Sequence, residues 1–135
     1  MSDVVVAVDV GGTVIKSAVV TKDAQVLARL RVPTSAALGT DVVYNNIVES
    51  VETLRTQLDE DSRVVAVGVV VTGIVDEKSG SAIHSENVGW NNIALRPMLE
   101  EQLGLPVGFG HDVRAGALAE GRLGAARGYD DYVFV

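Results

Sequence analysis

VVVAVDVGGTVIKSAVV, residues 4–20, decides how this chain folds. Two valine-rich runs flank the tripeptide Gly11-Gly12-Thr13, and apolar runs bounded by a glycine turn predict two antiparallel strands. A plain hairpin needs no charged residues at its turn, yet Asp9 precedes the glycines and Lys16 follows them. A carboxylate, two glycines, a hydroxyl and an amine on one turn indicate a site for a phosphate group and a metal ion.

Each residue type at this turn has a chemical reason to be there. Glycines let backbone N–H groups approach an anion without obstruction from a Cβ atom. Thr13 can donate to a phosphate oxygen, Asp9 can hold a hydrated Mg²⁺ ion, and Lys16 can add positive charge. The alternatives are a hairpin turn whose glycines only supply positive φ, and a solvated strand lysine. The pattern is neither a P-loop nor GxGxxG, because a strand follows it.

Outward from this hairpin, the hydrophobic periodicity predicts the remaining elements. The expected elements are strands over 4–10, 14–20 and 25–32, a helix from Thr40 (its N-cap) to near Leu58, a strand over 63–71, a helix over 95–104, a strand over 106–110, a helix over 112–124 and a strand over 132–135. Their order predicts an α/β fold with a mixed five-stranded sheet of order 3-2-1-4-5 and flanking helices.

Two segments stand out from this pattern. Residues 63–71 are apolar almost throughout, which predicts a strand covered on both faces. Residues 72–92 are rich in Gly, Ser, Asn and Asp, and we expect a long irregular segment with a functional role.

Asp112 comes just after the strand over 106–110, with His111 between them, and begins the expected helix over 112–124. It is either an N-cap or a general base that faces the same cleft as Asp9, because α/β sheets bind ligands at the carboxyl ends of their parallel strands. His111 can add a hydrogen bond to the same ligand, although a core or surface role is open too.

The stretch SENVGW, 85–90, is a candidate substrate loop. Asn87 can both donate and accept, which suits the hydroxyl groups of a sugar. Trp90 either stacks on a sugar face or anchors the loop in the core, the more common role. We expect His84 and Glu86 to be surface residues.

The composition excludes several classes of protein. The chain has 135 residues, 47% hydrophobic and 21% charged, so it can form one domain with a real core. Its formal net charge of −7, without a basic stripe, argues against a nucleic-acid surface. It has no cysteine, two isolated histidines and no membrane-spanning run, and residues at its N-terminus lack the basic start and apolar core of a signal peptide, so we expect none. We therefore expect a cytoplasmic protein that binds neither nucleic acid nor membrane.

Four stretches together resemble the ROK family of bacterial sugar kinases and related repressors, within the actin-like ATPase superfamily and its ribonuclease H-like lobes. They are DVGGTVIKSAVV at 9–20, GVVVTGIVDEKSG at 68–80, ENVGW at 86–90 and LRPMLEEQLGLPVGFGHDVRAGALAE at 95–120. The resemblance implies that residues 1–135 are the N-terminal lobe of an ATP-dependent hexose kinase.

The resemblance also assigns roles to individual residues. It implies that Asp112 is the catalytic base, that Asp9 serves ATP and Mg²⁺, and that Gly73, Asn87 and Asp112 lie near sugar hydroxyls. His111 and Arg114 stand where the family usually has asparagine.

The family's second lobe, with a further phosphate loop, more sugar ligands, a zinc site and the adenosine pocket, is absent from these residues. We therefore expect Zn²⁺ only in that lobe, no kinase activity from residues 1–135 alone, and a homodimer through an apolar surface that begins at Tyr132–Val135. The alternatives are the sugar-sensing domain of a ROK-type repressor and a non-kinase actin-like ATPase lobe. The repressor is the weaker expectation, since Met1 leaves no room for a helix-turn-helix before the first strand.

Overall fold

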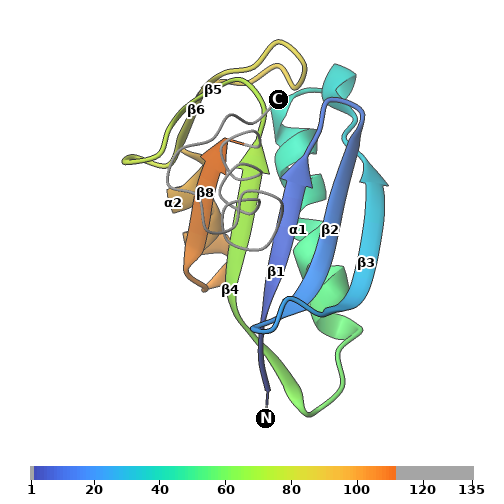
Figure 1. The fold of residues 1–135 in the computed structure, drawn as a ribbon. Helices are drawn as coiled ribbons and strands as arrows, with labels where there is room; N and C mark the ends of the chain where they lie inside the picture. The colour runs from blue at the N-terminus through green and yellow to red at the C-terminus, as the bar shows by residue number, and fades with distance from the viewer. Residues whose placement is uncertain (1, 112–135) are drawn as a thin grey trace, which may run out of the picture.

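The main sheet has five strands in the spatial order β3-β2-β1-β4-β8, as the computed structural model of residues 2–111 shows (Figure 1). This confirms the expected order 3-2-1-4-5, with β8 as the fifth strand of the sheet. The strands are β1 (Ser2–Val10), β2 (Val14–Thr21), β3 (Val26–Pro33), β4 (Ser62–Val71) and β8 (Val107–His111). The first three form an antiparallel meander, and β4 runs parallel to both β1 and β8, so the sheet is mixed.

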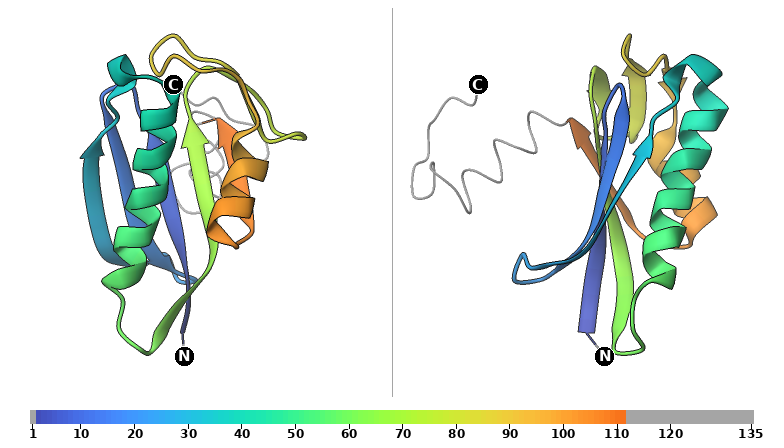
Figure 2. Two further views of the ribbon diagram at one scale, coloured as in Figure 1. Left: turned by 180° about the vertical axis from the view of Figure 1, so that it is seen from behind. Right: turned by 90° about the vertical axis from the view of Figure 1, so that its right-hand side faces the viewer.

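Helices α1 (Thr40–Thr56) and α2 (Leu95–Leu103) lie on one face of this sheet (Figure 2). A short 3-10 helix, η1 (Ala36–Leu38), precedes α1. The apolar residues of α1 recur every three or four positions and are buried, namely Val43, Ile47, Val51 and Leu54. They pack on the residues of β1 that alternate toward them, namely Val4, Val6, Val8 and Val10. Each such side chain stabilises the fold by roughly 1.5–3 kcal/mol relative to an exposed position.

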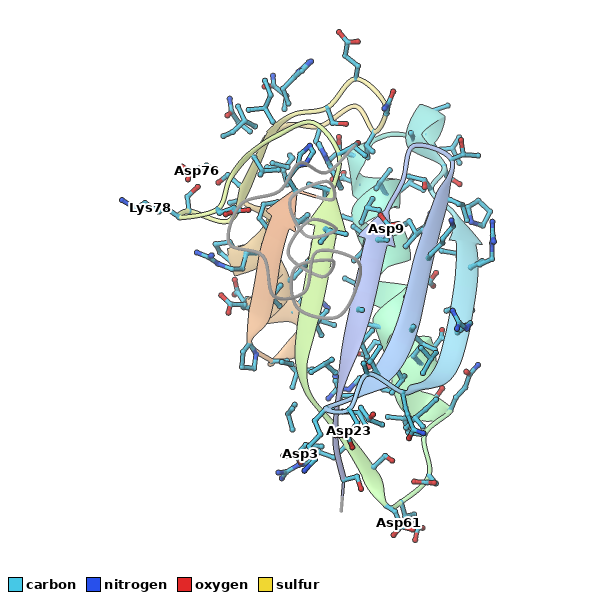
Figure 3. All side chains as sticks on the ribbon, in the orientation of Figure 1. Asp3, Asp9, Asp23, Asp61, Asp76 and Lys78 are labelled. Atoms are coloured by element: carbon cyan, nitrogen blue, oxygen red, sulfur yellow. The ribbon has the colours of Figure 1, made fainter. Side chains whose placement is uncertain are left out.

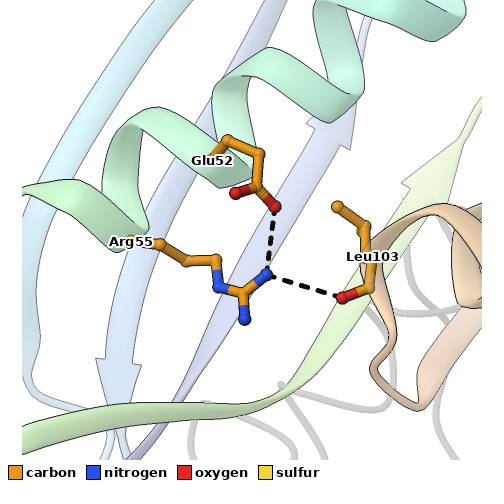
Figure 4. Close-up of polar contacts among 3 residues, drawn as sticks. All are labelled: Glu52, Arg55 and Leu103. Carbon is orange, nitrogen blue, oxygen red and sulfur yellow. Dashed lines mark hydrogen bonds and ion pairs between the residues drawn. The ribbon is translucent and has the colours of Figure 1, made fainter.

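Arg55 joins the last turn of α1 to the end of α2 (Figure 4). Its Nη1 donates to Glu52 Oε1 at 3.0 Å and to the carbonyl oxygen of Leu103 at 3.5 Å. The Arg55–Glu52 ion pair is partly exposed to solvent, so it contributes only ~0–1 kcal/mol. Apolar packing, and not this ion pair, therefore contributes most of the stability that holds the two helices on the sheet.

The expected N-cap at Thr40 is wrong. Thr40 is already the first helical residue, and the cap position belongs to Gly39, whose φ of 108° and ψ of 165° lie in a region open essentially to glycine alone. The helix ends at Thr56, two residues before Leu58. Gly104 ends α2 in the left-handed conformation, as expected of a helix stop, and its amide donates to the carbonyl oxygen of Glu100.

Two further expectations need correction. The strand expected over 63–71 is not covered uniformly on both faces: Val67, Val69 and Val71 are buried, whereas Gly68 is exposed. The segment 72–92 is not irregular but forms most of a second sheet of order β5-β6-β7 at the carboxyl end of β4 (Figure 1). Its strands are β5 (Ile74–Asp76), β6 (Ser81–His84) and β7 (Asn91–Ile93), each too short to show a period of two.

The expected helix over 112–124, the expected strand over 132–135, and with them Asp112 and Arg114, lie outside the described residues. Within residues 2–111, neither helix is long and apolar enough to cross a membrane.

Candidate functional site

The candidate site lies where β1, β4 and β8 end side by side. Val10 is paired with Val71, and Val71 with His111, so the carboxyl ends of the three parallel strands are level. Asp9 is on the face opposite the helices, because Val8 and Val10 point into the core and side chains alternate along a strand. Figure 3 shows Asp9 at this end of the sheet, far from Asp3, Asp23 and Asp61 at the other.

Lys16 is the cross-strand partner of Asp9. Because directly paired residues of antiparallel strands point to the same face, the ammonium and the carboxylate flank the glycine turn together. Both side chains are exposed. The structure thus brings together the two charged residues that the sequence placed around Gly11-Gly12-Thr13.

The turn itself is tied at both ends to one residue. Thr34 donates its hydroxyl to the carbonyl oxygen of Gly11 at 2.7 Å and its amide to the carbonyl oxygen of Thr13 at 2.9 Å. The amide of Gly11 donates to the carbonyl oxygen of Val14 at 3.1 Å. Within residues 2–111, the amides of Gly12 and Thr13 donate to no carbonyl oxygen or side chain. Two successive unused N–H donors at an exposed turn are what a phosphate-binding cradle requires.

The candidate substrate loop is closed by Ser85, a buried residue that sequence reasoning missed. Its amide donates to the carbonyl oxygen of Trp90 at 3.2 Å, and its carbonyl oxygen accepts from the amide of Gly89 at 2.7 Å. Its hydroxyl accepts from the amide of Val88 at 3.3 Å and lies 3.3 Å from the hydroxyl of Thr72. A serine three residues before the amide that it caps is a recurrent local motif, and this spacing was the available signal.

The loop brings Asn87 directly against the glycine turn. A Cβ atom built on Gly12 would lie 3.1 Å from Asn87 Cβ and 3.5 Å from the Asn87 carbonyl oxygen. The two candidate sites, 75 residues apart in the chain, are therefore so close that a methyl group on Gly12 would not fit between them without a shift, while the Asn87 side chain stays exposed.

Gly73 supports the base of the same loop. Its φ is +97°, and a methyl group there would overlap the carbonyl oxygen of His84 and stand 3.0 Å from Ser85 Cα. The structure therefore gives Gly73 a packing role beside the loop. Trp90 is 1% exposed, so it anchors the loop in the core and cannot stack on a sugar. Both His84 and Glu86 are exposed, as expected.

The model of the ROK family matches residues 5–135. The chain belongs to the ROK family. It is 30% identical over 131 residues to the glucokinase of Halalkalibacterium halodurans, an alignment that covers 96% of this chain and 40% of that protein. It is also 32% identical over 69 residues to a putative xylose repressor of Caldicellulosiruptor, covering 51% of this chain and 17% of the repressor.

Among solved structures, the ROK family glucokinase of Streptomyces griseus in complex with glucose and AMPPNP superposes with a TM-score of 0.84 at 31% identity. The match covers 95% of this chain and 39% of that one. The chain thus spans about 40% of the length of the glucokinases that it matches. The likeness confirms the mixed α/β fold and the family membership.

This ROK chain has a cavity of about 690 Å³ over the face of the main sheet opposite the helices, within the usual size range of ligand pockets. Its floor is a row of small residues at matching register positions of four strands, namely Ala18, Ala7, Gly68 and Gly108. Its ionisable lining residues are Asp9, Lys16, Arg29, Arg31, Glu77 and His111.

Glu77 lines this cavity and is a second residue, after Ser85, that sequence reasoning missed. Its Oε1 lies 3.1 Å from the position of a Cβ atom on Gly110, so the carboxylate reaches over the end of β8. Arg96 holds the turn that carries it, donating to the carbonyl oxygens of Glu77 at 2.9 Å and Lys78 at 2.7 Å. The acidic turn DEKSG between two short strands gave no sign in the sequence that it would fold back over the sheet.

The residues at the turn fit Mg²⁺ bound together with phosphate oxygens. Residues 2–111 contain no group of three His, Asp or Glu side chains that could enclose a metal ion. Mg²⁺ is commonly held by one or two carboxylates plus the phosphates of a substrate, and Asp9 beside the unused amides supplies that kind of donor set.

Proposed function

We propose that this chain is the N-terminal lobe of an ATP-dependent hexose kinase, which transfers the γ-phosphoryl group to a sugar hydroxyl. The observation that carries the proposal is the close approach of Gly12 to Asn87, which supports a phosphate-binding turn acting side by side with an amide suited to sugar hydroxyls. The glucokinases among the relatives support the same reaction.

The glycine turn binds the phosphates. The amides of Gly12 and Thr13 donate to phosphate oxygens, and the Thr13 hydroxyl adds a third donor. Asp9 holds Mg²⁺, which neutralises charge on the phosphates when it is bound. Lys16, on the same face as Asp9, contributes positive charge without being a metal ligand.

The sugar lies on the Asn87 side of the place where Gly12 and Asn87 meet, and the phosphates lie on the Gly12 side. Asn87 hydrogen-bonds a pair of hydroxyls, Gly73 supports the loop close to the sugar, and His111 at the end of β8 donates or accepts at a further hydroxyl. Asp112 takes the proton of the reacting hydroxyl as that oxygen bonds to the γ-phosphorus atom and the bond to the bridging oxygen of ADP breaks. The sugar, and not water, is the acceptor because the second lobe closes over the site.

The sugar-sensing domain of a repressor is the second candidate, because repressors are among the relatives. The alignment to the Caldicellulosiruptor repressor covers 51% of this chain, whereas the glucokinase alignment covers 96% of it. This difference favours the kinase.

The test uses the complete gene product with ATP, Mg²⁺ and a panel of hexoses, and follows ADP release. We expect turnover with at least one hexose, and we expect Asp112→Asn to lower kcat by ~10²–10⁴-fold with the sugar KM little changed. Asp23→Asn is the matched control, because Asp23 is an exposed carboxylate at the opposite end of the sheet (Figure 3). Sugar binding without any turnover would favour the repressor, and full activity in Asp112→Asn would place the base elsewhere.

A further inference from the structure

Thr34 connects the end of β3 to the glycine turn of the neighbouring hairpin. It is fully buried, at 0% exposure, and it follows the last residue of β3 directly. As described above, its hydroxyl and its amide hold the carbonyl oxygens of Gly11 and Thr13. No other described residue outside the hairpin holds both ends of this turn.

These two bonds fix the direction of the N–H groups that face outward. In a planar trans peptide, the C=O and the following N–H point in opposite directions. Because the carbonyl of Gly11 points at the Thr34 hydroxyl, the amide of Gly12 points away from Thr34. The hydroxyl of Thr34 thereby sets the orientation of one of the two unused donors without touching any ligand itself.

Thr34 is in turn held from α1. The side-chain amide of Asn46 donates to the carbonyl oxygen of Pro33 at 3.2 Å and to that of Thr34 at 3.3 Å. Pro33 is also the register partner of Val14, the first residue of β2. A continuous set of hydrogen bonds therefore runs from a helix on the core side of the sheet, through Thr34, to the glycine turn.

We propose that Thr34 is a positioning residue for the phosphoryl donor: it orients the Gly12 amide toward the phosphates, with Asn46 holding it in place. This inference rests on the proposed kinase function. It differs from a general structural role, because a turn that is merely destabilised would affect both substrates, whereas a rotated Gly12 amide affects the nucleotide alone.

The test compares Thr34→Val, Thr34→Ser and Tyr44→Phe in the complete gene product by steady-state kinetics. Valine keeps the shape of threonine and removes the donor, and serine restores the hydroxyl. Tyr44→Phe is the matched control, since the Tyr44 hydroxyl also donates to a carbonyl oxygen, that of Met98 at 3.0 Å, but away from the turn.

We expect Thr34→Val to raise the KM for ATP about tenfold, the factor that corresponds to ~1.4 kcal/mol, and to leave the KM for the sugar within about twofold. Thr34→Ser and Tyr44→Phe should both stay near the wild type. If Thr34→Val does not fold, Asn46→Ala tests the same set of hydrogen bonds. We expect Asn46→Ala to raise the KM for ATP by less than about tenfold and to leave the KM for the sugar unchanged.

Three results would overturn the inference: an unchanged KM for ATP in folded Thr34→Val, an equal rise in both KM values, or the same rise in Tyr44→Phe. A wild-type protein that phosphorylates no hexose would instead overturn the proposed function on which the inference rests.

Discussion

Replacing Gly73 by alanine should destabilise the fold more than an ordinary glycine substitution. Gly73 joins β4 to β5 with a φ of +97°, and the new methyl group would overlap the carbonyl oxygen of His84. Gly39 is the matched control: its φ is +108°, but nothing described lies within 4 Å of the position of its Cβ atom. Both substitutions place an alanine at a positive φ, and only Gly73→Ala adds a steric clash.

The expected free energies follow from these two contributions. A strained positive φ costs an alanine roughly 1–3 kcal/mol, and this applies to both sites. At Gly73 the backbone of β6 must also move away, and such overpacking costs about 1–3 kcal/mol more. We therefore expect a loss of about 2–6 kcal/mol for Gly73→Ala, out of the ~5–15 kcal/mol that stabilise a typical domain.

Urea unfolding followed by tryptophan fluorescence measures the difference. Trp90 is the sole tryptophan of the chain, is buried, and belongs to the loop that Ser85 closes. It therefore reports on the part of the molecule that the new methyl group displaces. Equal losses in Gly73→Ala and Gly39→Ala would show that the clash with His84 is absent, and the packing described at the base of this loop would be wrong.

Two further predictions concern single contacts. In Gly12→Ala the methyl group would stand 3.1 Å from Asn87 Cβ, so the loop must shift by several tenths of an ångström. We expect kcat of the complete gene product to fall ~10-fold, with little change in the free energy of unfolding. An unchanged kcat would contradict the close packing of Gly12 against Asn87. The pKa of Tyr44 is raised, first by burial and then by the charge of Glu101. In the unfolded chain Tyr44 ionises at its ordinary pKa near 10, below its pKa in the folded protein. The free energy of unfolding should therefore fall as the pH rises from ~10 through the folded pKa. In urea titrations, Tyr44→Phe should remove that part of the pH dependence.

The main sheet could be predicted from sequence because its strands are long and its signals agree. Residues 4–20 show two valine-rich runs around a glycine turn, and Val43 to Leu54 show a helical period. The small sheet could not be predicted in this way. Its strands have three or four residues, so its residues are placed by hydrogen bonds such as those of Ser85, which act between positions that no local pattern relates.

The residues of the candidate site also differ in whether a local sequence pattern could identify them. Asp9, Lys16 and the glycine turn could be identified because they are adjacent in the chain and suit phosphate chemistry together. Asn87 could be identified as a polar residue in an unusual loop, but not as a neighbour of Gly12. Glu77 and Thr34 were missed, since one reaches the cavity through a turn held by Arg96 and the other acts through backbone carbonyl groups. The prediction of Asp112 as the base stays a prediction.

The small sheet has a consequence for protein engineering. The chain leaves the main sheet after Val71 and enters α2 at Leu95, and the segment between them carries its own hydrogen bonds, including those that shape the Asn87 loop. It could thus be exchanged between relatives as one piece, provided that Arg96, which holds the Glu77 turn from α2, moves with it. Under the proposed kinase function, a chimera that carries the 72–96 segment of another family member should shift its sugar preference toward that donor's while its nucleotide KM stays the same, provided that position 12 remains glycine.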